Sequence, residues 1–220
     1  MSEALDPNDF IITRKRKKYR FALFSNNSLC FEHEKWDKTF RPNVAELGAG
    51  TGLFSVDLAA GDPDRNYVAI DIKGDRLQKG AYKAEEQKLE NLRFLRSRAD
   101  QLMEVLDPNS LDELWMTFSD PFPKKSSSGR RMTHENYLEK YAAILKPTGS
   151  IYIKHDNYEF FCWSLEQLVI NGWTIQELSF DLHESTLEGR YKTMTTYEER
   201  WLREGRITKF VKATPKKETE

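Results

Sequence analysis

Short apolar runs alternate with segments of helical spacing along most of the chain. The run 44–47 precedes one helical pattern and 66–71 precedes another, in which Leu77, Ala81 and Ala84 fall on one helix face. Repeated alternation of strand and helix predicts a doubly wound α/β fold with a mostly parallel sheet. Strands are expected at 44–47, 66–71, 92–96, 113–118, 150–154, 172–180 and 206–213, and helices at 53–60, 74–88, 102–106, 133–145, 158–170 and from 197 onward.

The last two expected strands are joined differently from the others. Segment 181–205 is helical only from residue 197, which is too little helix for a parallel crossover, so a late antiparallel strand completes the expected seven-stranded sheet. Within the helix at 133–145, Thr133 is the expected N-cap. Asn136 stands at the third helical position, where a full capping box has a Glu or Gln side chain.

The length and composition fit one folded domain. The chain has 220 residues, 39% of them hydrophobic, and single domains typically reach ~250 residues. No apolar run approaches the ~20 residues of a membrane span and the start shows no signal-peptide pattern, so we expect a cytoplasmic protein without a membrane partner. Cys30 and Cys162 are too few and too far apart for a disulfide framework or a metal cluster, and we expect no bound metal.

Positive charge is concentrated in two places although the net charge is only -1. Such clusters indicate nucleic-acid binding better than net charge does, but a charge run is usually a solvated face or a disordered arm. We assign residues 1–30 to a mobile basic arm that orders with a partner, and 31–220 to a single domain. The clusters are Arg14, Lys15, Arg16, Lys17, Lys18 and Arg20, and then Lys124, Lys125, Arg130 and Arg131.

A glycine-rich loop follows the first expected strand. Gly48, Gly50 and Gly52 allow positive φ angles and let a ligand approach the backbone and the free N–H groups of the next helix. The loop differs from the dinucleotide pattern G-x-G-x-x-G, and Glu46 precedes its first glycine. A carboxylate there repels a pyrophosphate and attracts an ammonium group, which favours S-adenosylmethionine as the ligand. The alternative is an ordinary turn.

A second acid stands where a ribose is held in doubly wound sheets. Asp71 ends the second expected strand, 19 residues after Gly52, and the carboxylate at this position accepts hydrogen bonds from ribose hydroxyls. Asp71 as a helix cap is the weaker alternative, because Asp75 is available for that role. Together these features predict a nucleoside site and favour a methyl donor over NAD.

Acids end four of the expected strands. Ligands of open α/β sheets bind outside the carboxyl ends of the strands, so Glu46, Asp71, Asp120 and Asp156 should share one rim. Asp156 taken alone fits an Asx turn equally well, because Asn157 follows it.

The segment after the fourth expected strand predicts a rigid corner. Pro121 and Pro123 take the chain out of the sheet, and Phe122 offers a stacking surface between them. Asp120 precedes this corner and Lys124 follows it as a cation.

Several stretches resemble the bacterial, single-chain tRNA (guanine-N7)-methyltransferases in order and spacing over most of 40–212. The most specific is Phe-Ser-Asp-Pro-Phe-Pro-Lys-Lys at 118–125, which is similar to the family signature F-S/P-D-P-W-P-K-K. Other similar stretches are Arg-Arg-Met-Thr at 130–133, Lys-His-Asp-Asn at 154–157 (K-T-D-N in the family), Asp-Leu-His at 181–183, Leu-Glu-Gly at 187–189 and Thr-Thr-Tyr-Glu at 195–198.

The resemblance implies a Rossmann-like class I methyltransferase that uses S-adenosylmethionine to methylate guanine N7 in the variable loop of tRNA. It implies that Asp120 lies between cofactor and base as the catalytic residue. By the same resemblance, the cofactor would be held by Glu46, Gly48, Gly50, Asp71, Arg98, Ala99 and Asp120, and tRNA would be contacted by Lys124, Asp156, Thr195 and Glu198.

The chain departs from the family pattern at three places. Phe122 replaces a Trp, the segment 126–129 replaces a basic loop, and Arg98 stands where the family has an adenine-reading Asp. Asp100 or the backbone near Arg98 and Ala99 could take over that role. A methyltransferase with another substrate and a tRNA-binding subunit without catalysis are the alternative functions, and either a monomer or a homodimer is compatible with the sequence.

Overall fold

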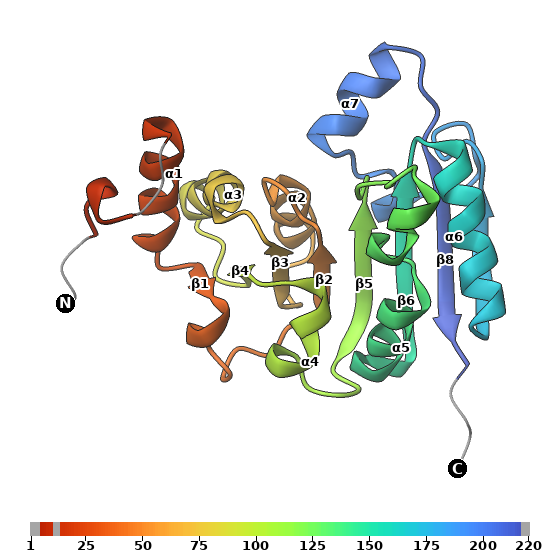
Figure 1. Ribbon diagram of the computed structural model, residues 1–220, viewed down its shortest axis with the longest axis horizontal. Coiled ribbons are helices and arrows are strands. Elements are labelled where there is room, and N and C mark those ends of the chain that lie inside the picture. Colours follow the sequence, from red (N-terminus) through yellow and green to blue (C-terminus); the bar gives the residue numbers. More distant parts are fainter. Residues whose placement is uncertain (1–4, 11–13, 217–220) are drawn as a thin grey trace.

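The computed structural model describes residues 5–10 and 14–216, and its centre is one mostly parallel sheet (Figure 1). The strand order is β1-β4-β3-β2-β5-β6-β8-β7. β8 runs antiparallel to both of its neighbours and lies between β6 and β7, which confirms the late antiparallel strand. The strands are β1 (Cys30–Glu32), β2 (Val44–Leu47), β3 (Tyr67–Asp71), β4 (Leu92–Arg96), β5 (Leu111–Thr117), β6 (Leu145–His155), β7 (Trp173–Ser179) and β8 (Lys209–Pro215).

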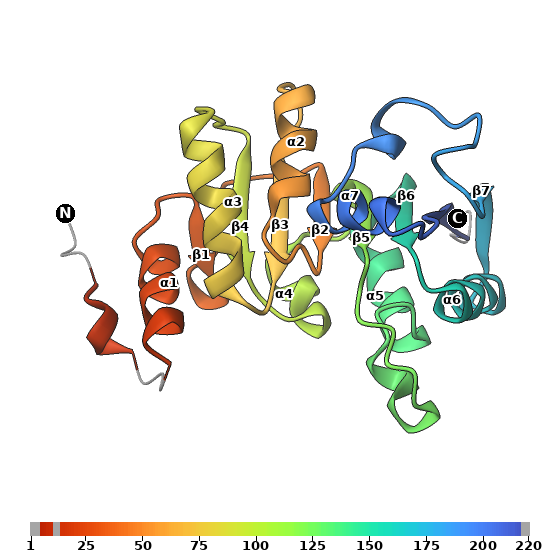
Figure 2. The ribbon, with the colours of Figure 1, turned by 90° about the horizontal axis from the view of Figure 1, so that it is seen from above.

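Helices cover both faces of this sheet, as the alternating pattern predicts. Figure 2 shows α2 and α5 on opposite sides of the strands. No helix within the described ranges is long and apolar enough to cross a membrane. The α-helices are α1 (Lys15–Ser25), α2 (Leu53–Gly61), α3 (Gly74–Glu86), α4 (Leu102–Val105), α5 (Glu135–Ile144), α6 (Tyr158–Ile170) and α7 (Thr196–Arg203), and the 3-10 helices are η1 (Pro7–Asp9), η2 (His33–Lys35), η3 (Ala99–Gln101), η4 (Lys125–Arg130) and η5 (Gly189–Lys192).

The two faces of the sheet carry separate apolar cores because side chains alternate along each strand. On β2, Ala45 and Leu47 face the core formed with α4, α5 and α6, whereas Val44 faces the core formed with α2 and α3. Glu46 is on the same face as Val44 by this alternation. Its carboxylate therefore points toward α2.

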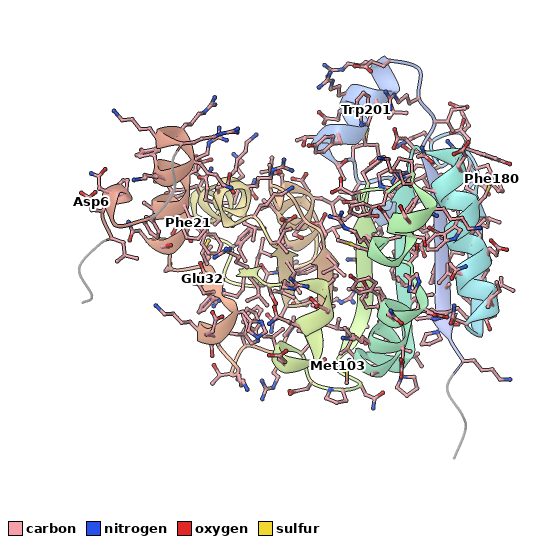
Figure 3. The ribbon with its side chains drawn as sticks, in the orientation of Figure 1. Asp6, Phe21, Glu32, Met103, Phe180 and Trp201 are labelled. Carbon is pink, nitrogen blue, oxygen red and sulfur yellow. The ribbon has the colours of Figure 1, made fainter. Side chains whose placement is uncertain are left out.

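In the described residues, the structure adds one strand and one α-helix to the predicted set. β1 is only three residues long and pairs with β4 at the edge of the sheet, which is too short for a period to be visible. Within the expected arm 1–30, residues 15–25 form α1, whose Phe24 packs against α3 at Gly74. Phe21, labelled in Figure 3, lies under the guanidinium of Arg96 at 4.8 Å. This part of the expected arm is therefore packed on the domain, while residues 1–4 and 11–13 lie outside the described residues.

The N-cap predicted for α5 is wrong by one residue. His134 is the N-cap, and its side chain accepts a hydrogen bond from the Asn136 N–H. Thr133 is buried, and its hydroxyl hydrogen-bonds the hydroxyl of Ser164 on α6 at 2.8 Å. Thr133 therefore forms a tertiary hydrogen bond instead of the predicted N-cap hydrogen bond.

Two glycines allow α3 and the Phe94 ring of β4 to pack closely against the glycine loop. Gly80 donates its N–H to the Thr51 carbonyl at 2.9 Å. A Cβ on Gly80 would lie 2.5 Å from that carbonyl oxygen, and one on Gly52 would lie 2.6 Å from the Phe94 ring. The position of the loop therefore depends on the absence of side chains at these two sites.

Replacing Gly80 by alanine should destabilise the fold. The added methyl group overpacks the contact with Thr51, and overpacking typically costs about 1–3 kcal/mol. Gly61→Ala is the matched control, because a Cβ there meets nothing within 4 Å and alanine favours the helix by about 0.5–1 kcal/mol. Thermal unfolding measures both, at about 2–4 °C per kcal/mol for a chain of this size. Equal midpoints for the two variants would refute the close-approach argument.

Candidate cofactor and substrate site

The glycine loop turns sharply between β2 and α2. Gly48, Gly50 and Gly52 have φ angles of 74°, 56° and 71°, which side chains disfavour. The Gly48 and Ala49 N–H groups donate to the Ile70 carbonyl at 2.8 and 3.0 Å, so the loop is fixed to β3. The sequence predicted this loop, and the structure forms it.

Glu46 is buried beside the loop with 3% of its surface exposed. Its carboxylate accepts hydrogen bonds from the hydroxyls of Ser55 at 2.6 Å and Thr117 at 2.9 Å. Burial raises the pKa of Glu46 to about 7, although both hydroxyls act to lower it. Ser55 and Thr117 were not predicted from the sequence, because single hydroxyl residues in α2 and β5 carry no distinctive signal.

Asp71 faces the loop from the end of β3. One carboxylate oxygen accepts from the Gly50 N–H and the other from the Lys73 N–H, both at 2.8 Å. Burial raises the pKa of Asp71, against these hydrogen bonds. The carboxylate is thus fixed in orientation by the backbone on both sides.

A cavity of about 540 Å³ brings most of the predicted residues together. Glu46, Asp71 and Asp120 line it, so three of the four strand-end acids share one cavity. Arg130 of the second basic cluster lines it as well, together with Met132, which had no predicted role. The other predicted residues on its wall are Gly48, Gly50, Arg98, Ala99 and Thr195, whereas Lys124, Asp156 and Glu198 are outside it.

One end of the cavity is formed by 97–100. Arg98 donates two hydrogen bonds to the Asp100 carboxylate, at 2.8 and 2.9 Å, and this pairing lowers the pKa of Asp100. Lys140 of α5 donates to the Asp100 carbonyl at 2.8 Å. Both carboxylate oxygens of Asp100 are therefore engaged by Arg98.

The corner that carries Asp120 has an unusual backbone. Phe118 and Phe122 have positive φ angles of 52° and 40°, which are strained for aromatic residues. Arg131 donates to the Phe122 carbonyl at 3.1 and 3.3 Å, and the guanidinium of Arg130 lies 4.4 Å from the Phe122 ring centroid. Asp120 itself is exposed at the cavity.

Lys124 and Asp156, the predicted tRNA contacts, are not in the cavity wall. Lys124 is exposed immediately before η4. Asp156 follows β6 and pairs with Arg206 at 2.9 Å, and that guanidinium lies 3.8 Å from the centroid of the Trp201 ring on α7. Trp201 is labelled on α7 in Figure 3.

Thr195 and Glu198 form the capping box of α7. The Thr195 hydroxyl accepts from the Glu198 N–H, and the Glu198 carboxylate accepts from the Thr195 N–H. Glu198 has no exposed surface, and it also pairs with Lys154 at 3.2 Å and His183 at 2.8 Å. Thr195 lines the cavity, but the buried Glu198 side chain contacts only other protein groups. The spacing T-x-x-E was the available signal for this cap.

The described residues hold no group of three or more His, Cys, Asp or Glu side chains placed to bind a metal ion. The carboxylates of Glu46 and Asp71 accept hydrogen bonds from hydroxyls and backbone N–H groups instead. These carboxylates accept hydrogen bonds, and they suit an organic ligand whose hydroxyl and ammonium groups donate them.

Solved structures of RNA methyltransferases share this architecture. The 16S rRNA methyltransferase KamB matches with a TM-score of 0.61 at 18% identity, over 84% of this chain and 91% of that chain. A variant of the 16S rRNA (adenine(1408)-N(1))-methyltransferase from Catenulisporales acidiphilia, with cosubstrate SAM, matches with a TM-score of 0.58 at 13% identity, over 98% and 94%. These similarities establish the Rossmann-like class I methyltransferase fold.

Sequence relatives are closer. Residues 40–211 match the methyltransferase family model Methyltransf_4. The chain is 37% identical over 171 residues to the tRNA (guanine-N(7)-)-methyltransferase of Lachnoclostridium phytofermentans, covering 76% of this chain and 79% of that protein. It is 35% identical over 170 residues to the Bacillus subtilis protein of the same name, again covering 76% and 79%. The chain therefore belongs to the tRNA (guanine-N(7)-)-methyltransferase family.

Proposed function

We propose that this chain transfers a methyl group from S-adenosylmethionine to N7 of a guanine in the variable loop of tRNA. The observation that carries the proposal is the convergence of Glu46, Asp71 and Asp120 on one cavity beside the glycine loop. The curated relatives are named for the guanine N7 reaction on tRNA. A tRNA substrate favours the cytoplasm as the place of action.

The residues of the cavity fit an adenosine that carries a charged amino acid chain. A volume of about 540 Å³ is within the range of small-molecule sites, about 300–1,000 Å³. Each oxygen of Asp71 accepts one N–H and retains a lone pair for a ribose hydroxyl. Glu46 supplies the counter-charge for an ammonium group, and no Cβ of Gly48 or Gly50 stands between the loop backbone and the ligand.

Adenine recognition differs from the family pattern in this chain. Arg98 replaces the expected Asp, and Asp100 has both carboxylate oxygens in the bidentate pair with Arg98. We therefore assign the reading of the adenine edge to backbone groups of Arg98 and Ala99, which line the cavity. The Arg98 and Asp100 pair then keeps this segment in place.

The chain contributes alignment and electrostatics to the reaction. S-adenosylmethionine supplies the electrophilic sulfonium methyl group when bound. Guanine N7 reacts through a lone pair and has no proton to lose, so positioning matters more than general base catalysis. The purine gains positive charge as the methyl group arrives, and the Asp120 carboxylate stabilises that charge while it accepts hydrogen bonds from the base.

The exposed cations of α1 fit the phosphates of tRNA. Arg14, Lys15, Arg16 and Lys17 stand at the N-terminal end of α1, whose first turn has no acidic residue. Cations are unfavourable at this positive end of the helix dipole, by about 0.3–1 kcal/mol each. None of the four forms an ion pair with another residue that the structure describes. A bound polyanion would neutralise this cluster.

The function is tested by incubating the protein with S-adenosylmethionine and tRNA that lacks the modification, followed by nucleoside analysis. Formation of 7-methylguanosine is expected. Cofactor binding without methyl transfer would instead support a tRNA-binding subunit without catalysis, and methylation of another molecule would support a different substrate class.

Replacing Glu46 by glutamine should weaken S-adenosylmethionine binding and change its pH dependence. Below its pKa of about 7 Glu46 is largely protonated, and only the ionised carboxylate attracts the ammonium group, whose own pKa is about 7.7–8.0. Affinity of the parent should therefore rise between pH 5.5 and 7, by up to about tenfold per pH unit. Calorimetry should show a weaker, flatter profile for Glu46→Gln. Asp57→Asn, at an exposed position of the same helix α2, should match the parent.

Substitutions of Asp120 and Lys124 should affect methyl transfer and tRNA binding differently. Asp120→Asn keeps the size but removes the charge, so single-turnover rates should fall by about tenfold for each 1.4 kcal/mol of lost transition-state stabilisation, with tRNA affinity kept. Lys124→Ala should weaken tRNA affinity as well, because binding a phosphate also stabilises the ground state. Asp112→Asn, at the opposite end of β5, is the control. An Asp120→Asn enzyme as fast as the parent would remove Asp120 from the mechanism.

Neutralising the α1 cations should reduce the salt dependence of tRNA binding. The double variant Lys15→Gln with Arg16→Gln should flatten the slope of log K against log salt by about 0.7–0.9 for each phosphate that the variant no longer neutralises. Lys38→Gln with Arg41→Gln removes the same charge from the segment before β2, at the opposite end of that strand from the glycine loop. Equal slopes for the two double variants would assign the α1 cluster to a solvated face.

A further inference from the structure

A buried histidine at the end of β6 contacts the corner that carries Asp120. His155 is 3% exposed, and its Nε2 lies 2.8 Å from the Ser119 carbonyl oxygen. Its Nδ1 lies 2.8 Å from the backbone nitrogen of Asn157. Both ring nitrogens therefore have a backbone partner.

These partners determine where the ring proton lies. The Asn157 N–H can only donate, so Nδ1 must accept. The proton is then on Nε2, which donates to the Ser119 carbonyl. The ring is also packed beside Phe160, with centroids 4.5 Å apart, and Phe118, with centroids 6.2 Å apart. A neutral, oriented imidazole satisfies every polar contact at this position.

The Ser119 carbonyl belongs to the peptide unit that joins Ser119 to Asp120. Because a peptide unit is planar, holding its oxygen also fixes the backbone nitrogen of Asp120. The corner has two other attachments, from the Phe118 N–H to the Lys154 carbonyl at 2.9 Å and from Arg131 to the Phe122 carbonyl. His155 thus holds the strained corner at the point nearest to Asp120.

We propose that His155 is a positioning residue for Asp120, which it orients toward the base through the Ser119 carbonyl. This inference rests on the proposed function of Asp120. The family resemblance has Thr at this position (K-T-D-N), and one hydroxyl group cannot occupy the positions of both ring nitrogens. In this chain, the position of the corner that carries Asp120 therefore depends on a side chain that can be protonated.

The charged groups around the ring come from three segments. Asp156 Oδ1 lies 3.5 Å from Nδ1, and Lys209 of β8 donates to the Asp156 carbonyl. Arg206 pairs with the outer oxygen of Asp156. Burial lowers the pKa of His155 below its ordinary 6.5, although Ser119 and Asp156 act to raise it. His155 is therefore neutral above pH 6.5 and becomes protonated only as the pH falls through its lowered pKa. A proton on Nδ1 would then repel the Asn157 N–H.

Two substitutions separate the two ring contacts. In His155→Gln the amide nitrogen can reach the position of Nε2 and keep the bond to Ser119, whereas in His155→Asn the amide oxygen can reach only the position of Nδ1. Single-turnover methyl transfer to tRNA should fall about tenfold in His155→Asn and stay within about threefold of the parent in His155→Gln, with tRNA and S-adenosylmethionine affinities kept in both. In the parent, the methyl-transfer rate should fall as the pH decreases and His155 becomes protonated. This fall should be smaller in His155→Gln, because the amide does not titrate.

Equal rates in parent and His155→Asn would overturn the proposal, as would equal losses in the two variants accompanied by equal losses of thermal stability. ¹⁵N NMR of the parent provides a test that needs neither variant. It should show the Nε2–H tautomer of His155 persisting below pH 6.5, and the opposite tautomer would overturn the proposal. If the parent forms no 7-methylguanosine, the proposed function fails, while the tautomer still reports on His155.

Discussion

A buried carboxylate joins three elements at the glycine-loop side of the cavity. Glu46 on β2 accepts hydrogen bonds from Ser55 on α2 and Thr117 on β5. Burying a carboxylate is unfavourable unless hydrogen bonds replace those to water, and these two hydroxyls do so in part. A shift of α2 away from β2 would remove one donor. The geometry of the glycine loop and the burial of Glu46 therefore depend on each other.

The cavity wall at the start of α7 is held by a second buried charge pair. Lys154 donates to Glu198 at 3.2 Å and to the Thr193 carbonyl at 2.7 Å, and neither charged side chain is exposed. Glu198 also caps α7 and contacts His183. Leaving one partner of such a pair buried alone is strongly destabilising, by about 3–5 kcal/mol. The wall of the cavity at the start of α7 is thus part of the interior of the protein rather than an independent loop.

Sequence reasoning identified what local periodicity and topology determine. Seven strands, the glycine loop and the strand-end acids follow from alternation and from the rule that parallel strands end at one rim. β1 and α1 escaped because one is three residues long and the other begins with cations. Contacts between distant side chains, such as Lys154 with Glu198 or Thr133 with Ser164, leave no trace in spacing. The roles assigned to individual site residues stay predictions.

The place of β8 in the sheet has a consequence for biosynthesis. β7 is made before β8, yet its ladder in the sheet is with β8, which lies between it and β6. Until residues 209–215 leave the ribosome, β6 has an open edge beside Ile151 to His155 and β7 has no strand to join. The glycine loop, by contrast, has its neighbours β3 and β5 in place much earlier. The nascent chain can therefore form the glycine-loop side of the cavity well before the side at the start of α7.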